Sequence, residues 1–153
     1  MEQPPAACGI RYDSGASVAL GSLAPSAFPA VGSRSPLRPF TWSAGCEVAG
    51  DATAVRQVDV TYGSLTSITD AENGRTAVQA GGATGLEFEV VRGVSGASPE
   101  GTPVRFGTAL NLGATSTAAP VNLVENMGVR LVRTGEIGEG PTEGGITINL
   151  TYR

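Results

Sequence analysis

The last nine residues, GITINLTYR (145–153), alternate more regularly than any other segment of the sequence. Apolar side chains lie at every second position, with polar ones between them, and this period of two is typical of a half-buried β-strand. The apolar set is Ile146, Ile148, Leu150 and Tyr152. Domain ends usually fray, so a strand this regular over the final residues raises the question of what holds it in place.

The composition of the chain and the spacing of its turn-forming residues predict further strands along the whole sequence. The 22 Gly and 10 Pro residues, with 41% apolar residues in patterned blocks, favour short strands and turns over helices or disorder. Besides the final segment, alternation predicts strands at 18–23, 38–47, 54–63, 84–93, 102–107 and 119–135. Seven strands in 153 residues predict a single all-β domain, an immunoglobulin-like β-sandwich.

Individual residues refine this prediction. Asn73-Gly74 is a strong signal for a tight turn or hairpin. Trp42 lies in a segment whose alternate residues are apolar, so it is the candidate for the core tryptophan of the sandwich. Glu125 falls on the apolar parity of its strand, which predicts a bulge or an edge position there.

The two cysteines, Cys8 and Cys46, allow one intramolecular pairing. In a β-rich chain a disulfide is favoured over two free thiols, and it implies an oxidising compartment. Closing a loop of this length would stabilise the fold by roughly 4 kcal/mol. Two cysteines without any histidine make a poor zinc site, and no metal or cofactor is predicted.

Charge and residue content argue against several functions. A net charge of −4 does not suit nucleic-acid binding, no apolar run is long enough for a membrane-spanning helix, and MEQPPAACG is not a signal peptide. The lack of histidine excludes Ser-His-Asp and Cys-His catalysis. Glu87 and Glu89 share a strand face and could be imagined as a glycosidase pair, but we predict a solvated sheet face. The sequence therefore predicts a protein that is not an enzyme.

Three groups of residues, in order and spacing, resemble the pilins of chaperone-usher fimbriae. Cys8, VALGSL (18–23) and PFTWSAGCE (39–47) are similar to the opening of that family, and TGLEFEVVRG with TPVRFG is similar to its central strands. The ending VRLVRTGEIGEGPTEGGITINLTYR is similar to the C-terminal motif of the family. In it, Gly140 is the fourteenth residue from the end and Tyr152 is the penultimate one.

The resemblance implies an incomplete immunoglobulin-like sandwich that lacks its final strand and is completed by a donated strand. Ile146, Ile148, Leu150 and Tyr152 would face the groove, and the carboxylate of Arg153 would anchor basic residues of a periplasmic chaperone. The implied partners are that chaperone, an outer-membrane usher and a neighbouring pilin subunit that donates the strand. The implied location is the periplasm during assembly and then a fimbrium on the bacterial surface, where it supports adhesion.

Residues 1–7, MEQPPAA, are too short and too rich in proline to be a donor strand. They are predicted to be either a trimmed N-terminal extension or a linker from the receptor-binding domain of a two-domain tip adhesin, with residues 8–153 forming the pilin domain. The alternative from another class is a self-contained secreted immunoglobulin-like ligand-binding module. In that case the four apolar residues of the last strand would be ordinary core.

Overall fold

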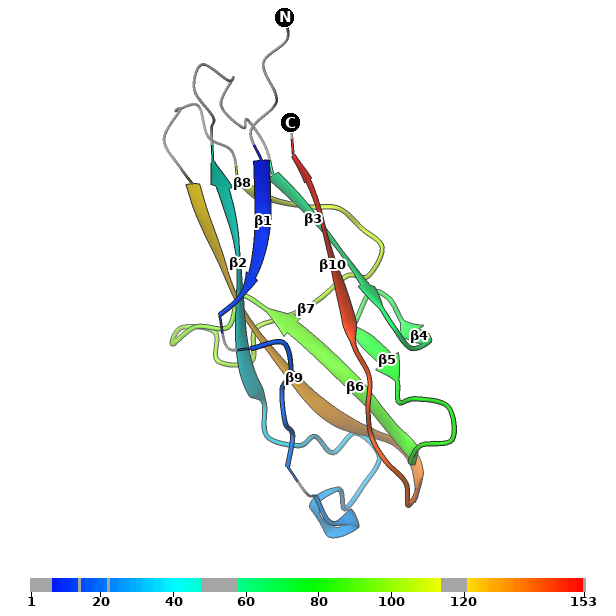
Figure 1. Cartoon of the computed structure of the whole chain (residues 1–153). Helices are drawn as coiled ribbons and strands as arrows, with labels where there is room; N and C mark the ends of the chain where they lie inside the picture. Colours follow the sequence, from blue (N-terminus) through cyan, green and yellow to red (C-terminus); the bar gives the residue numbers. More distant parts are fainter. Residues whose placement is uncertain (1–6, 14, 22, 48–57, 114–120, 153) are drawn as a thin grey trace, which may run out of the picture.

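Two antiparallel β-sheets packed face to face form the fold (Figure 1). The computed structural model describes residues 7–13, 15–21, 23–47, 58–113 and 121–152. The strands in these residues are β1 (Ala7–Tyr12), β2 (Arg38–Glu47), β3 (Val58–Ser64), β4 (Ile68–Asp70), β5 (Arg75–Ala77), β6 (Thr84–Arg92), β7 (Thr102–Pro103), β8 (Leu110–Gly113), β9 (Val121–Gly138) and β10 (Ile146–Tyr152). A 3-10 turn spans Pro25–Ala27. No helix in the described part is long and apolar enough to cross a membrane.

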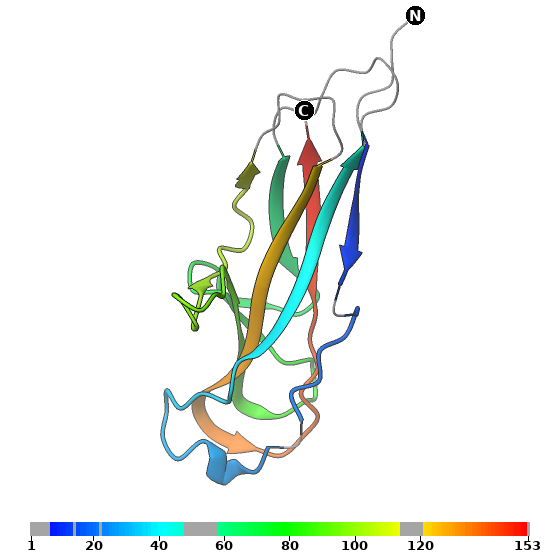
Figure 2. The same ribbon diagram turned by 90° about the vertical axis from the view of Figure 1, so that its left-hand side faces the viewer.

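The larger sheet has the strand order β1-β2-β9-β6-β5-β4, with β7 added to β6, and the smaller sheet has the order β10-β3-β8. β9 is 18 residues long and joins two parts of the larger sheet. Its first half pairs with β2 and its second half with β6, and Figure 2 shows β2 and β9 running alongside each other. The strands that are remote in sequence are thereby held in one layer.

The core lies between the two sheets and is centred on Trp42 of β2, which is 1% exposed. Its indole Nε1 donates to the Tyr62 hydroxyl at 3.2 Å and to the Met127 sulfur at 2.9 Å. The Trp42 and Tyr62 rings meet edge to face, with centroids 6.1 Å apart. Such pairs contribute about 0.5–1.5 kcal/mol beyond the area that they bury. Trp42 therefore occupies the core position that the sequence predicts.

The strands with the clearest alternation are confirmed. The predicted strand 38–47 coincides with β2, 84–93 corresponds to β6, and 119–135 corresponds to β9, which extends to Gly138. The predicted strand 54–63 corresponds to β3 from Val58 onward, and 54–57 lie outside the described residues. Asn73-Gly74 forms the turn between β4 and β5, where Gly74 has a φ of 68°, which favours glycine.

Two strand predictions are wrong or too long. The described part of 18–23 forms no strand; instead, Leu20 and Leu23 pack against a second apolar cluster around Phe28. Of 102–107, only Thr102–Pro103 is a strand, while Val104 and Phe106 are buried in the core from an irregular segment. In both places the apolar spacing serves packing without a continuous strand, although the Val104 and Phe106 amides donate to the Val90 and Ala71 carbonyls. The short strands β1, β4, β5 and β8 were not predicted.

Glu125 fits one of the two alternatives predicted for it. β2 pairs with β9 through the Trp42–Glu125 pair with no shift in register, so there is no bulge. On the other side, the pairing with β6 ends at Met127, so Glu125 lies just beyond the end of that neighbour. Its carboxylate is 3.0 Å from the Arg92 guanidinium, and this ion pair compensates the burial of a residue that is 8% exposed.

Glu89 corrects the prediction of a solvated face, because its side chain is buried. Arg75, Glu89 and Arg130 lie in register across β5, β6 and β9, and Arg34 approaches from a segment that bridges to Val132 of β9. The Glu89 carboxylate is 2.6 Å from Arg130 Nη2, 3.4 Å from Arg75 Nε and 3.3 Å from Arg34 Nε. Burial alone would raise the pKa of Glu89, but the hydrogen bonds and charge of Arg130, with the charges of Arg34 and Arg75, hold it below its usual value.

Candidate functional site at the edge beside β10

β10 pairs with one neighbour only among the described residues. It is antiparallel to β3 along its whole length, from Ile146 opposite Ser64 to Tyr152 opposite Val58. No described strand pairs with its other edge. β1 ends the larger sheet in the same way, because in the described part it pairs with β2 alone. Within the part of the chain that the structure describes, each sheet thus ends in a strand with a free edge.

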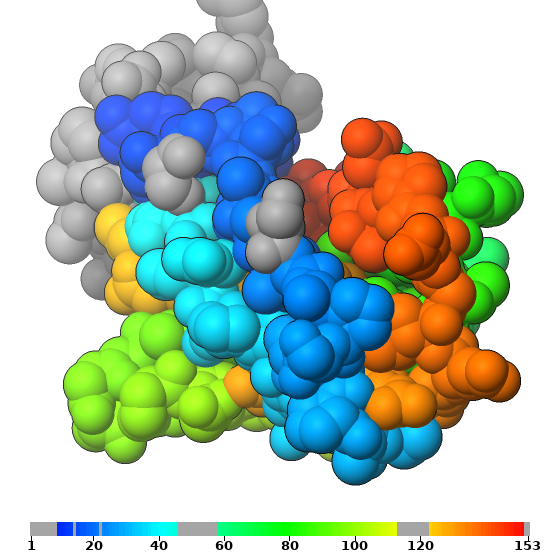
Figure 3. All heavy atoms as spheres, turned by 90° about the horizontal axis from the view of Figure 1, so that it is seen from below, coloured from blue at the N-terminus to red at the C-terminus, as the bar shows by residue number. Residues whose placement is uncertain are grey.

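The two free edges lie on the same side of the sandwich. β1 and β10 run side by side in opposite directions in both ribbon views (Figures 1 and 2). Seen from below, a hollow separates the N-terminal part of the chain, in blue, from the segment that leads into β10, in orange-red (Figure 3). The described structure therefore leaves the sandwich open along this side.

The open side has an apolar lining. Ile146, Ile148 and Leu150 pack against the core cluster from β10, and Ile10 does so from β1. All four are only half-buried, whereas the residues at the centre of the core are fully buried. On the opposite face of β10, Asn149 and Thr151 are exposed. An unpaired edge beside half-covered apolar side chains is a liability in a free protein and a template for an added strand.

A glycine-rich segment sets the place where β10 begins. Residues 139–145 lie against the loop that precedes β6, where the Ala83 amide donates to the Pro141 carbonyl at 2.9 Å. A Cβ on Gly140 would lie 2.7 Å from the Ala83 nitrogen, a distance that does not allow a side chain. Close backbone contact therefore accounts for glycine at 140, the position that the sequence singled out by resemblance.

Part of the predicted groove is brought together by the structure. Ile146, Ile148 and Leu150 share the core side of β10 as predicted. Tyr152 lies opposite Val58 by its backbone, but its side chain and the whole of Arg153 lie outside the described residues, so their roles stay predictions. The sequence analysis missed Ile10 on β1, although the alternation in CGIRY (8–12) was a weak signal for it.

Cys8 and Cys46 face each other by backbone register, because β1 and β2 pair these two residues directly. Their side chains lie outside the described residues. Residues directly opposite in an antiparallel pair have Cα atoms about 4.5–5.5 Å apart, which is within the range that a disulfide needs. The pairing supports the predicted bond between the edge strand β1 and its neighbour.

We expect Cys8 and Cys46 to be bonded, so the unreduced protein should be two hydrogens lighter by mass spectrometry than the dithiol. Reduction should lower the free energy of unfolding by roughly 4 kcal/mol, measured by urea denaturation. A Cys8→Ser/Cys46→Ser variant is the control, and its stability should not respond to reductant. Labelling of both thiols in the native, unreduced protein would contradict the prediction.

Among the described residues, no group of three or more His, Cys, Asp or Glu side chains is placed to hold a metal ion. The chemistry that the open edge offers is main-chain hydrogen bonding and apolar contact. Both are means of binding another polypeptide.

Comparisons with known proteins agree with this geometry. No family model and no curated protein sequence matches the chain, but solved structures do. The CupB6 tip adhesin from Pseudomonas aeruginosa is similar with a TM-score of 0.69 and 22% identity, over 96% of this chain and 38% of the adhesin. The P pilus rod subunit PapA gives a TM-score of 0.63 and 21% identity, over 95% of this chain and 99% of PapA.

A third structure, the antigen and type I fimbria protein of Burkholderia pseudomallei, gives a TM-score of 0.59 and 17% identity, over 96% of this chain and 99% of that protein. The chain therefore spans nearly the full length of two fimbrial proteins and 38% of the tip adhesin. At these identities the comparisons show the fold, and the predicted all-β, pilin-like sandwich is confirmed.

Proposed function

We propose that this chain is a pilin subunit of a chaperone-usher fimbria, or the pilin domain of its tip adhesin, and that it accepts a donated strand between β1 and β10. The observation that carries this proposal is the free edge of β10 beside half-buried Ile146, Ile148 and Leu150, in a fold shared with fimbrial proteins. A pilin likeness alone would support the fold; the open edge supports the function.

The added strand would act in two ways. Its main chain would hydrogen-bond to the free edge of β10, and its alternate apolar side chains would pack between Ile10 on one side and Ile148 and Leu150 on the other. This closes the sandwich and covers the half-buried lining. A periplasmic chaperone supplies the strand first, and a neighbouring subunit replaces it when an outer-membrane usher assembles the fibre. The chain then becomes part of a surface fimbrium that supports adhesion.

Co-expression in the periplasm with the chaperone of its own assembly system should give a one-to-one complex that co-purifies. Leu150→Asp should abolish co-purification, because a carboxylate would be buried beside the incoming strand. Asn149→Asp is the matched control, since Asn149 is exposed on the other face of β10 and the added charge is the same.

The co-purification test has a clear contrary result. If the wild-type chain accumulates as a stable monomer that never retains the chaperone, or if Leu150→Asp retains the chaperone as well as Asn149→Asp does, the proposed function is wrong.

A further inference from the structure

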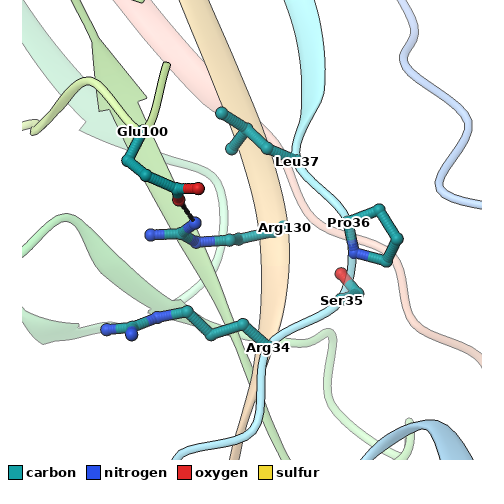
Figure 4. A pocket seen from close by; sticks show the side chains of 6 residues that line it. All are labelled: Arg34, Ser35, Pro36, Leu37, Glu100 and Arg130. Carbon is teal, nitrogen blue, oxygen red and sulfur yellow. Dashed lines mark hydrogen bonds and ion pairs between the residues drawn. The ribbon is translucent and has the colours of Figure 1, made fainter. Parts of the chain in front are cut away.

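A shallow pocket lies on the face of the larger sheet that is turned away from the core, remote from the open edge. Its volume is about 660 Å³, and it is lined by Arg34, Ser35, Pro36, Leu37, Glu100 and Arg130 (Figure 4). The start of segment 34–37 is fixed beside β9, because the Ser35 amide donates to the Leu131 carbonyl at 2.9 Å and the Leu131 amide donates to Ser35 Oγ at 2.8 Å. The side of the pocket that carries Arg34 is therefore held in place by hydrogen bonds to β9.

Two guanidinium groups point to the same side of this pocket, from Arg34 and from Arg130 (Figure 4). Arg130 is held firmly: Nε and Nη2 donate to buried Glu89, and Nη1 donates to Glu100. Arg34 is held loosely, because its contacts with Glu89 are 3.3 and 3.5 Å long and its side chain is 47% exposed. The outward donors of Arg34 are thus available to a ligand.

Charge in the pocket is not balanced. Arg34, Arg75 and Arg130 carry three positive charges, and the carboxylates in contact with them, Glu89 and Glu100, carry two negative ones. One further negative charge would neutralise the cluster, although the net charge of the whole chain is −4. Glu100 comes from a loop and its side chain is 70% exposed, so a carboxylate already reaches Arg130 from the solvent side.

We propose that this pocket binds one small organic carboxylate, held by Arg34 with Arg130 and packed against Pro36 and Leu37. A planar guanidinium matches a carboxylate through two parallel hydrogen bonds. A monoanion fits better than a phosphate dianion, because the second charge would face Glu100 without a partner. Pro36 and Leu37 give an apolar wall for the carbon skeleton of the ligand. This proposal does not depend on the fimbrial function.

Isothermal titration with two acidic probes, their two neutral counterparts and inorganic phosphate tests the proposal and the source of the carboxylate. Glucuronate represents an acidic sugar and N-acetyl-aspartate amide an acidic side chain; glucose and N-acetyl-asparagine amide are their neutral counterparts. We expect at least one acidic probe to bind while its neutral counterpart does not. Failure of both acidic probes to bind, or binding of inorganic phosphate as tight as that of the better acidic probe, would overturn the assignment.

Three variants locate the binding. Arg34→Gln should weaken carboxylate binding about tenfold, the size of one charge-assisted pair, and Arg34→Lys should fall between this variant and the wild type. Glu100→Gln should strengthen binding several-fold, because it removes the internal competitor for Arg130. Arg105→Gln is the matched control, since Arg105 is exposed and does not line the pocket. Equal losses in Arg34→Gln and Arg105→Gln, or weaker binding in Glu100→Gln, would contradict the proposal.

Discussion

A peptide with alternating apolar residues should raise the melting temperature of this chain by roughly 10 °C, either in excess or fused after Arg153 through a flexible linker. The lining of the open side is only half-buried at Ile10, Ile148 and Leu150. Each peptide side chain buried there contributes roughly 1.5–3 kcal/mol, and each new main-chain hydrogen bond about 0.5–1.5 kcal/mol. Ordering the peptide costs about 1–2 kcal/mol per residue, which leaves a net gain of a few kcal/mol.

The measurement is a thermal melt followed by circular dichroism, with a scrambled peptide of the same composition as control. The scrambled peptide should have much less effect, because its apolar side chains would not all face the lining. The Leu150→Asp variant should not respond to either peptide. If the isolated chain melts cooperatively at high temperature and ignores every donor peptide, the sandwich is complete as it stands. The self-contained immunoglobulin-like module would then be the better account.

Glu89→Ala should lower the free energy of unfolding by about 3 kcal/mol, measured by urea denaturation at pH 7. The substitution leaves Arg130 beneath the sheet surface without its main partner, and loss of one member of a buried pair costs about 3–5 kcal/mol. We expect a cost at the lower end of this range, because Arg34 and Arg75 are partly exposed and their charges are screened by solvent. Glu87→Ala, two residues away on the same strand face, is the control and should cost far less.

The effect of Glu89 should depend on pH in a defined direction. Because the pKa of Glu89 is lower in the folded chain than its usual value near 4.3, its stabilising contribution is fully present above that value. The contribution is lost as the pH falls through the folded pKa. The difference in stability between the wild type and Glu89→Ala should therefore shrink below about pH 4. A difference that stays constant down to pH 2 would show that Glu89 acts by packing alone.

The alternation of apolar and polar residues was sufficient to predict a strand where one face of the strand lies in the core and its backbone pairs with a neighbouring strand. Phe40, Trp42 and Ala44 all pack in the core cluster, and the predicted strand matches β2 at both ends. The same pattern misled at 18–23, because Leu20 and Leu23 need only an apolar surface and not a neighbouring strand. Sequence spacing states which side chains share a face, but it does not state whether the backbone has a hydrogen-bonding partner.

Features that depend on which strands pair, and in which register, could not be predicted from the sequence. Glu89 looked like a solvated residue because its parity is polar, but β5 and β9 place Arg75 and Arg130 directly beside it. Arg34, 55 positions away in the sequence, also reaches it. For the candidate site, Ile146, Ile148 and Leu150 could be predicted from β10 alone, whereas Ile10 could not. Its contribution depends on β1 lying beside β10, which is a property of how the two sheets pack.

The pairing of the strands also affects the rate at which the chain folds. Ile146 pairs with Ser64 and Glu125 with Trp42, each more than 80 positions away in the sequence. Chains dominated by such distant pairings fold slowly, because loop closure must precede the contacts that reward it. During that delay β2, β3 and β10 present unpaired edges to other chains and invite aggregation. A partner that holds the edge of β10 early would therefore act on the yield of folding, before it contributes to the stability of the finished fold.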